Sequence, residues 1–361
     1  MSLENIREET ELWEKLKNTE KAIVLYGMGD GADKILNVCE QKGIEVQGVF
    51  ASDEFVRGQT FRGYTVKTYA DIKEELSDLI ILVSFASKLD SVMKKIYNLC
   101  EYDELYAPDV PVFGDGLFDK AFFTENFDNF KTVYSALSDD TSKIAYENVI
   151  RYKITGNLKY LRECETTTDE CYKNIIMPKS GSGYADIGAY NGDTIREYIS
   201  YAGSNVNVYA FEPDEKNFAK LEKNVSVLGV KSANLFNIAA WDKEEELTFY
   251  SRSGRNSAHT TNHSGLRETK IRADRPDKYI DSRIDYINID AEGSDMQAIK
   301  GLSGTVDKYK PVISCAVYHR NEDMFALPLL LMQMYGKYKL YLRHFPYIPA
   351  WDTNIYIKYD E

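Results

Sequence analysis

The sequence lacks the features that would place it in a membrane or in a disulfide framework. It has no run of about 18 apolar residues, so we expect no membrane-spanning helix. The first residues are acidic, whereas a secretory signal starts with basic residues followed by an apolar stretch. The five cysteines are scattered without CxxC spacing, which favours reduced thiols over disulfides or a zinc site. We therefore expect a soluble, unexported, cytoplasmic protein.

Positive charge is also in short supply. The chain holds 44 Lys and Arg against 57 Asp and Glu, a net charge of −13. Residues 1–117 contain 13 basic and 22 acidic residues, so the acidity is concentrated at the front. Proteins that bind nucleic acid present a basic face to the phosphates, and the composition therefore disfavours nucleic acid as a partner. It leaves the oligomeric state open.

At 361 residues the chain is long enough for two domains, each with its own core. Hydrophobic periodicity and turn signals divide it into four parts. They are an N-terminal helix over residues 1–19, an α/β domain over 20–115, a helical connector over 116–180 and a second α/β domain over 181–361.

The first α/β domain opens with an apolar strand, residues 22–26, followed by a glycine turn and a helix. Gly27, Gly29 and Ala32 approximate the GxGxxA pattern of dinucleotide-binding turns, and Asp53 follows as a candidate for a ribose hydroxyl. The alternative is that these glycines only permit close helix packing. The domain resembles the small Rossmann-like domains fused to sugar-modifying enzymes, whose ligands are often nucleotide-linked sugars.

The stretch YADIGAYNGDT, residues 184–194, organises the second α/β domain. It has the pattern of a buried strand, an acidic residue near the strand's end, a glycine turn and a helix start. Open α/β sheets bind ligands at the carboxyl ends of their strands, where glycines allow close backbone approach. Because Asp186 would repel a pyrophosphate, this turn favours a sulfonium cofactor, S-adenosylmethionine, over a dinucleotide.

Polar side chains end the strands that follow. The second strand, residues 206–211, runs into Glu212 and Pro213, where a carboxylate can accept hydrogen bonds from a ribose diol. The fourth and fifth strands end in Asp290 and His319. Since the carboxyl ends of parallel strands meet at one edge of a sheet, we expect these groups to converge.

Residues 180–361 resemble the FkbM-type S-adenosylmethionine-dependent methyltransferases. The resemblance rests on blocks in the same order: DIGAYNGDT, YAFEPDEKNFAKLEKN, DYINIDAEGSDMQAIKG, PVISCAVYHRNEDMFALPLLL, and YLRHF followed by WDTNIYI. It implies an α/β fold of the class I methyltransferase type, a doubly wound sheet of seven strands whose last strand, residues 353–359, is antiparallel. It also implies methyl transfer to a hydroxyl group, often on a sugar.

The resemblance implies roles for individual residues as well. The cofactor is expected to contact the first glycine turn, the end of the second strand and the end of the third: Asp186, Gly188, Ala189, Asn191, Gly192, Glu212, Pro213, Ala239 and Ala240. Asp290, Glu292 and His319 are expected to face the transferred methyl group. Two departures, Asn288 where lysine is common and Ala291 where a β-branched residue is common, concern the acceptor more than the chemistry.

A hydroxyl acceptor must lose its proton during methyl transfer. A neutral histidine with a pKa near 6.5 is a natural base, so His319 is the expected base and Asp290 the second candidate. His319 could instead be a hydrogen-bonded structural residue. Asp290 and Glu292 could instead hold a divalent metal through oxygen ligands, an alternative that the sequence does not favour.

A long basic linker joins the third and fourth strands of this domain. Long loops in compact domains are usually functional or disordered. Arg252, Arg255, His259 and His263 are therefore expected to contact an anionic acceptor, such as a phosphorylated or uronic-acid sugar or a nucleotide-sugar. A solvated loop is the alternative.

The sequence thus predicts an O-methyltransferase that acts on a hydroxyl of a sugar, nucleotide-sugar or surface glycan precursor. Its partner is a small-molecule or glycan acceptor. Two other functions stay open: an NAD(P)-dependent sugar-modifying oxidoreductase that uses the N-terminal glycine turn, and a non-catalytic scaffold that only binds the cofactor.

Overall fold

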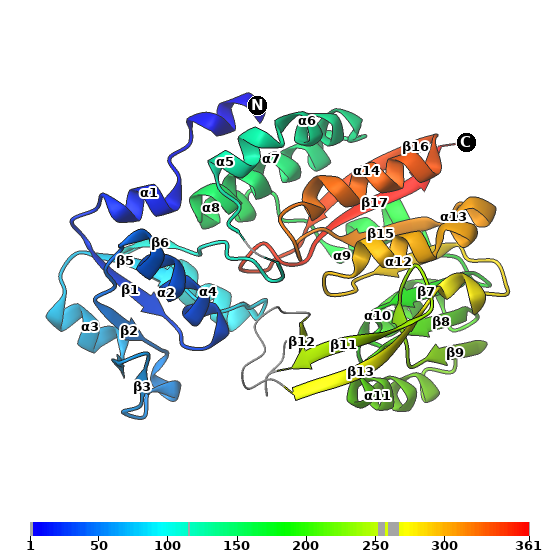
Figure 1. The fold of residues 1–361 in the computed structure, drawn as a ribbon, viewed down its shortest axis with the longest axis horizontal. Coiled ribbons are helices and arrows are strands. Elements are labelled where there is room, and N and C mark those ends of the chain that lie inside the picture. Colours follow the sequence, from blue (N-terminus) through cyan, green and yellow to red (C-terminus); the bar gives the residue numbers. More distant parts are fainter. Residues whose placement is uncertain (1–2, 115, 252–256, 259–266, 361) are drawn as a thin grey trace.

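The chain folds into two α/β parts, each built on a mostly parallel sheet, with a group of helices beside them (Figure 1). The computed structural model describes residues 3–114, 116–251, 257–258 and 267–360. Within these ranges no helix is both long and apolar enough to cross a bilayer. A third, small sheet projects from the C-terminal part as a ribbon.

The first residues form two short helical segments instead of the single helix predicted for residues 1–19. Leu3–Glu8 (η1) is a 3-10 helix and Leu12–Lys17 (α1) is an α-helix, and the extended backbone of Glu11 separates them. The apolar side chains of η1 join the core shared with the helical layer, whereas those of α1 pack on the N-terminal sheet. Because of this break, η1 and α1 pack into two different hydrophobic cores.

The N-terminal sheet has six strands in the order β3-β4-β2-β1-β5-β6, parallel except for the pair β3 and β4. Strands β1 and β5 are almost wholly buried, as expected for central strands covered on both faces. The elements are β1 (Ala22–Tyr26), α2 (Asp30–Lys42), β2 (Gly48–Phe50), η2 (Asp53–Phe55), β3 (Thr60–Phe61), β4 (Tyr64–Lys67), α3 (Tyr69–Glu75), β5 (Leu79–Val83), α4 (Asp90–Leu99) and β6 (Glu104–Tyr106).

The helical layer covers the edge of the C-terminal sheet that ends in β16 (Figure 1). It consists of α5 (Lys120–Glu125), α6 (Phe127–Ala136), α7 (Asp140–Thr155), α8 (Leu158–Arg162), α9 (Thr168–Cys171) and η3 (Tyr172–Ile176). The Ser138 amide donates to the Leu340 carbonyl of β16 at 2.8 Å, and the Leu340 amide donates to the Ser138 hydroxyl at 2.9 Å. The predicted connector therefore packs as a layer of the C-terminal part.

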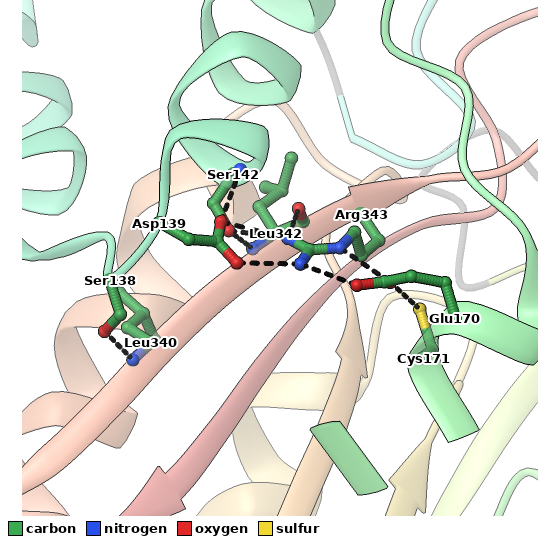
Figure 2. Close-up of polar contacts among 8 residues, drawn as sticks. All are labelled: Ser138, Asp139, Ser142, Glu170, Cys171, Leu340, Leu342 and Arg343. Carbon is green, nitrogen blue, oxygen red and sulfur yellow. Dashed lines mark hydrogen bonds and ion pairs between the residues drawn. The ribbon is translucent and has the colours of Figure 1, made fainter. Parts of the chain in front are cut away.

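A buried arginine ties this layer to the sheet (Figure 2). Arg343 of β16 is 3% exposed and forms ion pairs with Asp139 at 2.8 Å and with Glu170 at 3.0 Å. Its guanidinium also donates to the Ser142 hydroxyl at 2.7 Å. Since Asp139 caps α7 and Glu170 lies in α9, one cation holds two helices against one strand.

The C-terminal sheet has seven strands in the order β16-β17-β15-β14-β7-β8-β9. β17 runs antiparallel to both neighbours and the remaining pairs are parallel, which confirms the predicted class I topology. The elements are β7 (Gly183–Ile187), α10 (Asp193–Ala202), β8 (Asn207–Phe211), α11 (Glu215–Ser226), β9 (Ser232–Phe236), β14 (Tyr286–Ile289), α12 (Asp295–Gly301), α13 (Ser303–Tyr309), β15 (Val312–Ala316), α14 (Asp323–Tyr335), β16 (Tyr338–His344) and β17 (Thr353–Tyr359).

Part of the basic linker is a β-ribbon, so its prediction as a loop is wrong for those residues. β11 (Glu245–Ser251) pairs antiparallel with β13 (Arg267–Asp274) along its whole length. β10 (Ala239–Ala240) and β12 (Ser257–Ala258) complete this sheet, and η4 (Pro276–Lys278) leads from it toward β14. Residues of the linker in β13 form backbone hydrogen bonds with β11, and this pairing cannot be recognised from the sequence of either strand alone.

The N-terminal part contacts the C-terminal sheet at its β16–β17 loop. The amide of Ser87 donates to the Ile348 carbonyl at 2.8 Å, and the amide of Ile348 donates to the Ser87 carbonyl at 3.0 Å. The segment after β6 adds a second contact, because the amide of Phe113 donates to the His319 carbonyl at 3.1 Å. The two parts are thereby joined on the side where the strands of the C-terminal sheet end.

Candidate active site at the strand ends

Neighbouring strands bring four polar segments to one edge of the C-terminal sheet. β7 lies between β8 and β14, and β15 lies beyond β14. Gly188 follows β7, Glu212 follows β8, Asp290 follows β14, and His319 comes three residues after β15. Because these strands are parallel, their following residues meet at the same edge.

The turn after β7 requires glycine at its first position. Gly188 has a φ of 83°, and a Cβ there would lie 1.9 Å from the carbonyl oxygen of Asp290. The amides of Gly188 and Ala189 donate to the carbonyl of Phe211 at 2.9 and 3.0 Å. The turn is thus bonded to the end of β8 and presents bare backbone toward the end of β14.

Asp186 supports the turn from inside the sheet. Its side chain has no exposed surface and accepts hydrogen bonds from the Thr194 hydroxyl at 2.5 Å and the Asn288 amide at 3.0 Å. Burial raises the pKa of Asp186 to about 6, although both hydrogen bonds oppose the shift. The carboxylate therefore fixes β7, β14 and the start of α10 relative to one another. Its contact with a cofactor stays a prediction.

Glu212 is the carboxylate that faces the turn. It is 6% exposed, and its two oxygens accept the amides of Tyr190 and Asp214, each at 2.8 Å. Burial raises the pKa of Glu212 to about 7, although these two amides oppose the shift. A carboxylate oxygen has two lone pairs, so each oxygen keeps one for a further donor.

Asp290 is the exposed carboxylate of the site. Its side chain is 44% exposed, its Oδ1 lies 3.1 Å from His319 Nε2, and the Tyr318 hydroxyl lies 3.3 Å from its Oδ2. Glu292, two residues later, has a φ of 46° and is also exposed. Surrounding protein raises the pKa of Glu292 to about 7, and the negative charge of Asp290 adds to the shift. Two carboxylates with different surroundings therefore lie beside the turn.

His319 is held between two carboxylates, which corrects its expected state. It is 3% exposed, with Nε2 on Asp290 and Nδ1 on Asp295 Oδ2 at 2.9 Å. Burial alone would lower the pKa of His319, but the charge of Asp295 and hydrogen bonds to both carboxylates raise it well above 6.5. We expected a neutral base, whereas a carboxylate at each ring nitrogen and a raised pKa favour the protonated imidazolium, which can donate from both nitrogens.

Asp295 is a site residue that sequence reasoning missed. It is 1% exposed at the start of α12 and accepts the amides of Ala291 and Gly293 at 2.8 and 3.1 Å. Burial tends to raise its pKa, but His319 and these amides lower it. The signal was present, because Asp295 lies within the IDAEGSD block that also carries Asp290 and Glu292.

Asp323 lies close to this pair. Ligand atoms of Asp295, His319 and Asp323 lie within 4.8 Å of one another, so their distances alone would suit a metal ion. The His319 nitrogen is already bonded to Asp295, and Asp323 Oδ2 accepts the amide of Arg320 at 2.9 Å. A hydrogen-bonded network accounts for this cluster without an ion.

A second group that the sequence did not reveal comes from the segment between the two parts. The amide of Phe113 donates to the His319 carbonyl at 3.1 Å, and the two rings meet edge to face at 5.8 Å. A Cβ on Gly293 would lie 3.1 Å from the Phe113 ring. Phe113 therefore covers the Asp295 side of the histidine, although it lies 206 residues away in the sequence.

The remaining predicted cofactor residues lie in the loops around the site and in β10. Asn191 accepts the Asn224 side-chain amide with its carbonyl, and the Gly192 amide donates to the Ala189 carbonyl. Ala239 and Ala240 are buried in β10 and pair with β13. Pro213 accepts the Asn237 amide at 3.1 Å. The predicted acceptor residues lie outside the described residues: Arg252, Arg255, His259 and His263.

The C-terminal part has the fold of the class I methyltransferases. Residues 186–348 match the family model described as "Methyltransferase FkbM domain", so the C-terminal part is an S-adenosylmethionine-dependent methyltransferase domain of the FkbM type. Residues 19–105 match a separate family described as "C2185-like, N-terminal". Among curated proteins, no relative matches the chain.

Solved structures support the fold over nearly the whole chain. An FkbM methyltransferase from Methylobacillus flagellatus KT is 19% identical, covers 98% of this chain and 93% of its own, and has a TM-score of 0.72. A putative rRNA methylase from Clostridium thermocellum is 16% identical, covers 55% and 98%, and has a TM-score of 0.36. The first of these similarities shows the fold.

Proposed function

We propose that the protein transfers a methyl group from S-adenosylmethionine to a hydroxyl of a sugar, nucleotide-sugar or glycan precursor. The observation that carries this proposal is the pairing of the buried Glu212 carboxylate with the Gly188 turn, next to the exposed carboxylate of Asp290. The family match of residues 186–348 supports the methyl donor. The hydroxyl acceptor is the finer part of the proposal.

The residues at this edge fit an S-adenosyl group. The free lone pairs of Glu212 suit the two hydroxyls of a ribose, because a diol donates two hydrogen bonds to a carboxylate. Gly188 lets the turn pack directly against the backbone at the end of β14, which brings the turn and Asp290 to the same edge of the sheet. When bound, S-adenosylmethionine supplies an electrophilic methyl group on a positively charged sulfur.

Asp290 is the proposed base. The acceptor's O–H bond breaks as its oxygen bonds to the methyl carbon, and the proton passes to a carboxylate oxygen of Asp290. The bond between the methyl carbon and the donor's sulfur breaks at the same time, and S-adenosylhomocysteine leaves. His319 is a positioning residue in this scheme, because its Nε2–H holds Asp290 while Asp295 holds its Nδ1–H. Correct placement of two reactants can contribute about 7 to 11 kcal/mol to the lowering of a barrier.

Calorimetric titration of the full chain with S-adenosylhomocysteine and with NAD⁺ tests this function against the oxidoreductase alternative. We expect binding of S-adenosylhomocysteine and none of NAD⁺. Binding of NAD⁺ without S-adenosylhomocysteine would overturn the proposal. Binding of S-adenosylhomocysteine with no turnover on any hydroxyl acceptor would instead support the scaffold alternative.

A further inference from the structure

The loop between β16 and β17 lies against the proposed base. β17 is antiparallel to β15, with Ala316 opposite Asn354. The residues just before β17 are therefore brought beside those just after β15. The amide of Val317 donates to the Thr353 carbonyl at 3.0 Å, and the rings of Tyr318 and Trp351 lie 6.4 Å apart at an angle of 22°.

Three aromatic rings and one lysine extend from the base to the N-terminal part. Tyr318 places its hydroxyl near Asp290, and Trp351 follows Tyr318 in the row. The ring of Tyr347 lies 5.9 Å from that of Trp351, at 39°. The ammonium of Lys88 lies 5.9 Å above the Tyr347 ring, beside the Ser87–Ile348 backbone bonds described above.

A second group of stacked rings in the C-terminal part shows how the row of Tyr318, Trp351 and Tyr347 differs from core packing. Tyr184, Tyr198 and Tyr286 also form a stack, with centroids 4.4 to 5.5 Å apart, and each is at most 4% exposed. None of the three rings in the loop row is buried to that degree; all are partly accessible. Rings that served only to fill the core would be buried, as Tyr184, Tyr198 and Tyr286 are.

The charges beside the row define the class of ring that can bind there. Burial raises the pKa of Tyr318, and Asp290, Glu292 and Asp352 all lie close enough for their charges to raise it further. Burial likewise raises the pKa of Asp352, whereas the charge of Lys88 lowers it. Among the described residues, an anionic ring would meet these three carboxylates and two cations, Lys88 and the protonated His319, so its binding would be opposed. A neutral polyhydroxylated ring can present its C–H face to the aromatic rings and its hydroxyls to the carboxylates.

We propose that Tyr318, Trp351 and Tyr347, with Lys88 from the N-terminal domain, form the wall on which a neutral pyranose acceptor stacks, so that one of its hydroxyls reaches Asp290. The inference rests on the proposed function and adds the acceptor site and its class. The N-terminal domain then has a direct role, since Ser87 and Lys88 hold the loop that carries the wall.

Saturation-transfer difference NMR on the full chain with bound S-adenosylhomocysteine tests the wall. The probes are the methyl pyranosides of glucose, galactose and mannose, methyl glucuronoside as the anionic ring, and phenol as a planar aromatic. We expect transfer to the ring C–H protons of at least one neutral pyranoside. The signal should fall about fivefold or more in Trp351→Ala and Tyr347→Ala, since one aromatic contact contributes about 1 kcal/mol.

Two control variants separate binding from folding. Trp351→Phe keeps an aromatic face and should retain most of the signal, and Tyr102→Ala removes a 77% exposed ring of the N-terminal domain and should retain all of it. Undiminished transfer in both alanine variants, stronger transfer to glucuronoside or phenol, or silence of every neutral pyranoside would overturn the inference. If S-adenosylhomocysteine itself fails to bind the wild type, the proposed function fails instead.

Discussion

In each of the two large sheets, the first strand of the α/β unit is apolar and is followed by a glycine turn and a helix. In the N-terminal part these are β1, the turn at Gly27 and α2, and in the C-terminal part β7, the turn at Gly188 and α10. A Cβ on Gly27 would lie 2.6 Å from the ring of Phe85, which fills the space beside that turn. A Cβ on Gly188 would instead meet the backbone at the end of the neighbouring strand.

The strands next to the two turns differ more. After β2, Ser52 bonds its hydroxyl to that of Tyr26 at 2.7 Å, and Asp53 is exposed in η2. After β8, Glu212 is buried against its turn with both oxygens bonded to amides. A glycine turn after a first strand is thus compatible with packing alone. The buried acid at the tip of the second strand is what distinguishes the C-terminal turn, and we propose that it binds a ribose.

The largest expected effect is the loss of turnover when the proposed base, Asp290, is replaced. Asp53, the acid near the N-terminal turn, is the control. Asp290→Asn should lower kcat for methyl transfer about 10²- to 10⁴-fold, because an amide cannot accept the hydroxyl proton. Binding of S-adenosylhomocysteine should stay unchanged, and Asp53→Asn should leave both quantities as in the wild type. Steady-state turnover with a pyranoside acceptor measures the rates. An unchanged kcat in Asp290→Asn would remove Asp290 from the base role.

The two glycines give the most direct contrast between the turns. Gly188→Ala should abolish binding of S-adenosylhomocysteine, because its Cβ would overlap a backbone carbonyl at 1.9 Å. Gly29→Ala adds a Cβ that meets nothing within 4 Å, and only its φ of 136° is unfavourable, at a cost of about 1 to 3 kcal/mol. Calorimetry should therefore show normal binding in Gly29→Ala. Loss of binding in both variants would give the turns equal roles.

A third prediction concerns the stability of the C-terminal part, which the ion pairs of the buried Arg343 should support. Arg343→Met leaves Asp139 and Glu170 without their cation and should destabilise the fold by about 3 kcal/mol. Lys339→Met on the same strand removes an exposed pair with Asp360 and should cost less than about 1 kcal/mol. Urea unfolding followed by circular dichroism measures both. Equal, small losses would mean that the helical layer does not depend on Arg343.

The smallest expected effect is a change of stability with pH. It should arise in the C-terminal part, because the four histidines all lie in the second half of the chain. His344 is fully buried, and burial lowers its pKa to about 3. The unfolded chain takes up this proton near pH 6.5 and the folded chain does not, so the stability contributed by neutral His344 is present above pH 6.5 and falls below it. At pH 5 the loss should be about 2 kcal/mol.

Unfolding of the wild type and of His344→Leu at pH 7 and pH 5 isolates this contribution. The difference in stability between the two pH values should be smaller in the variant. His319 has the opposite sign, since its raised pKa stabilises the fold at low pH and that stability is lost as pH rises through the folded pKa. An identical pH dependence in wild type and variant would contradict the assignment of His344.

Local patterns predicted the C-terminal fold well. The stretch from Tyr184 to Thr194 became β7, its turn and the start of α10, and the last strand was predicted with its observed ends, Thr353–Tyr359. The resemblance implied seven strands with an antiparallel last strand, and both features are confirmed. These features depend on residues close together in the sequence, where periodicity and turn chemistry are informative.

What the sequence could not predict depends on contacts between distant residues. The charge of His319 is set by Asp295, the ring beside it comes from Phe113, and the aromatic row joins Tyr318 to a loop 30 residues later. The ribbon was missed because β11 finds its partner only across the linker. A base predicted from its usual pKa is unreliable when two carboxylates surround it.

The central claim is that the acid after the second strand of the C-terminal sheet makes this edge a cofactor site. Calorimetric titration of the wild type, Glu212→Ala and Asp53→Ala with S-adenosylhomocysteine tests it most directly. Loss of two hydrogen bonds to a charged group, each contributing about 1.5 to 3 kcal/mol, should weaken binding at least about 100-fold in Glu212→Ala. Asp53→Ala should bind as the wild type does. Equal affinity in Glu212→Ala and the wild type would contradict the account.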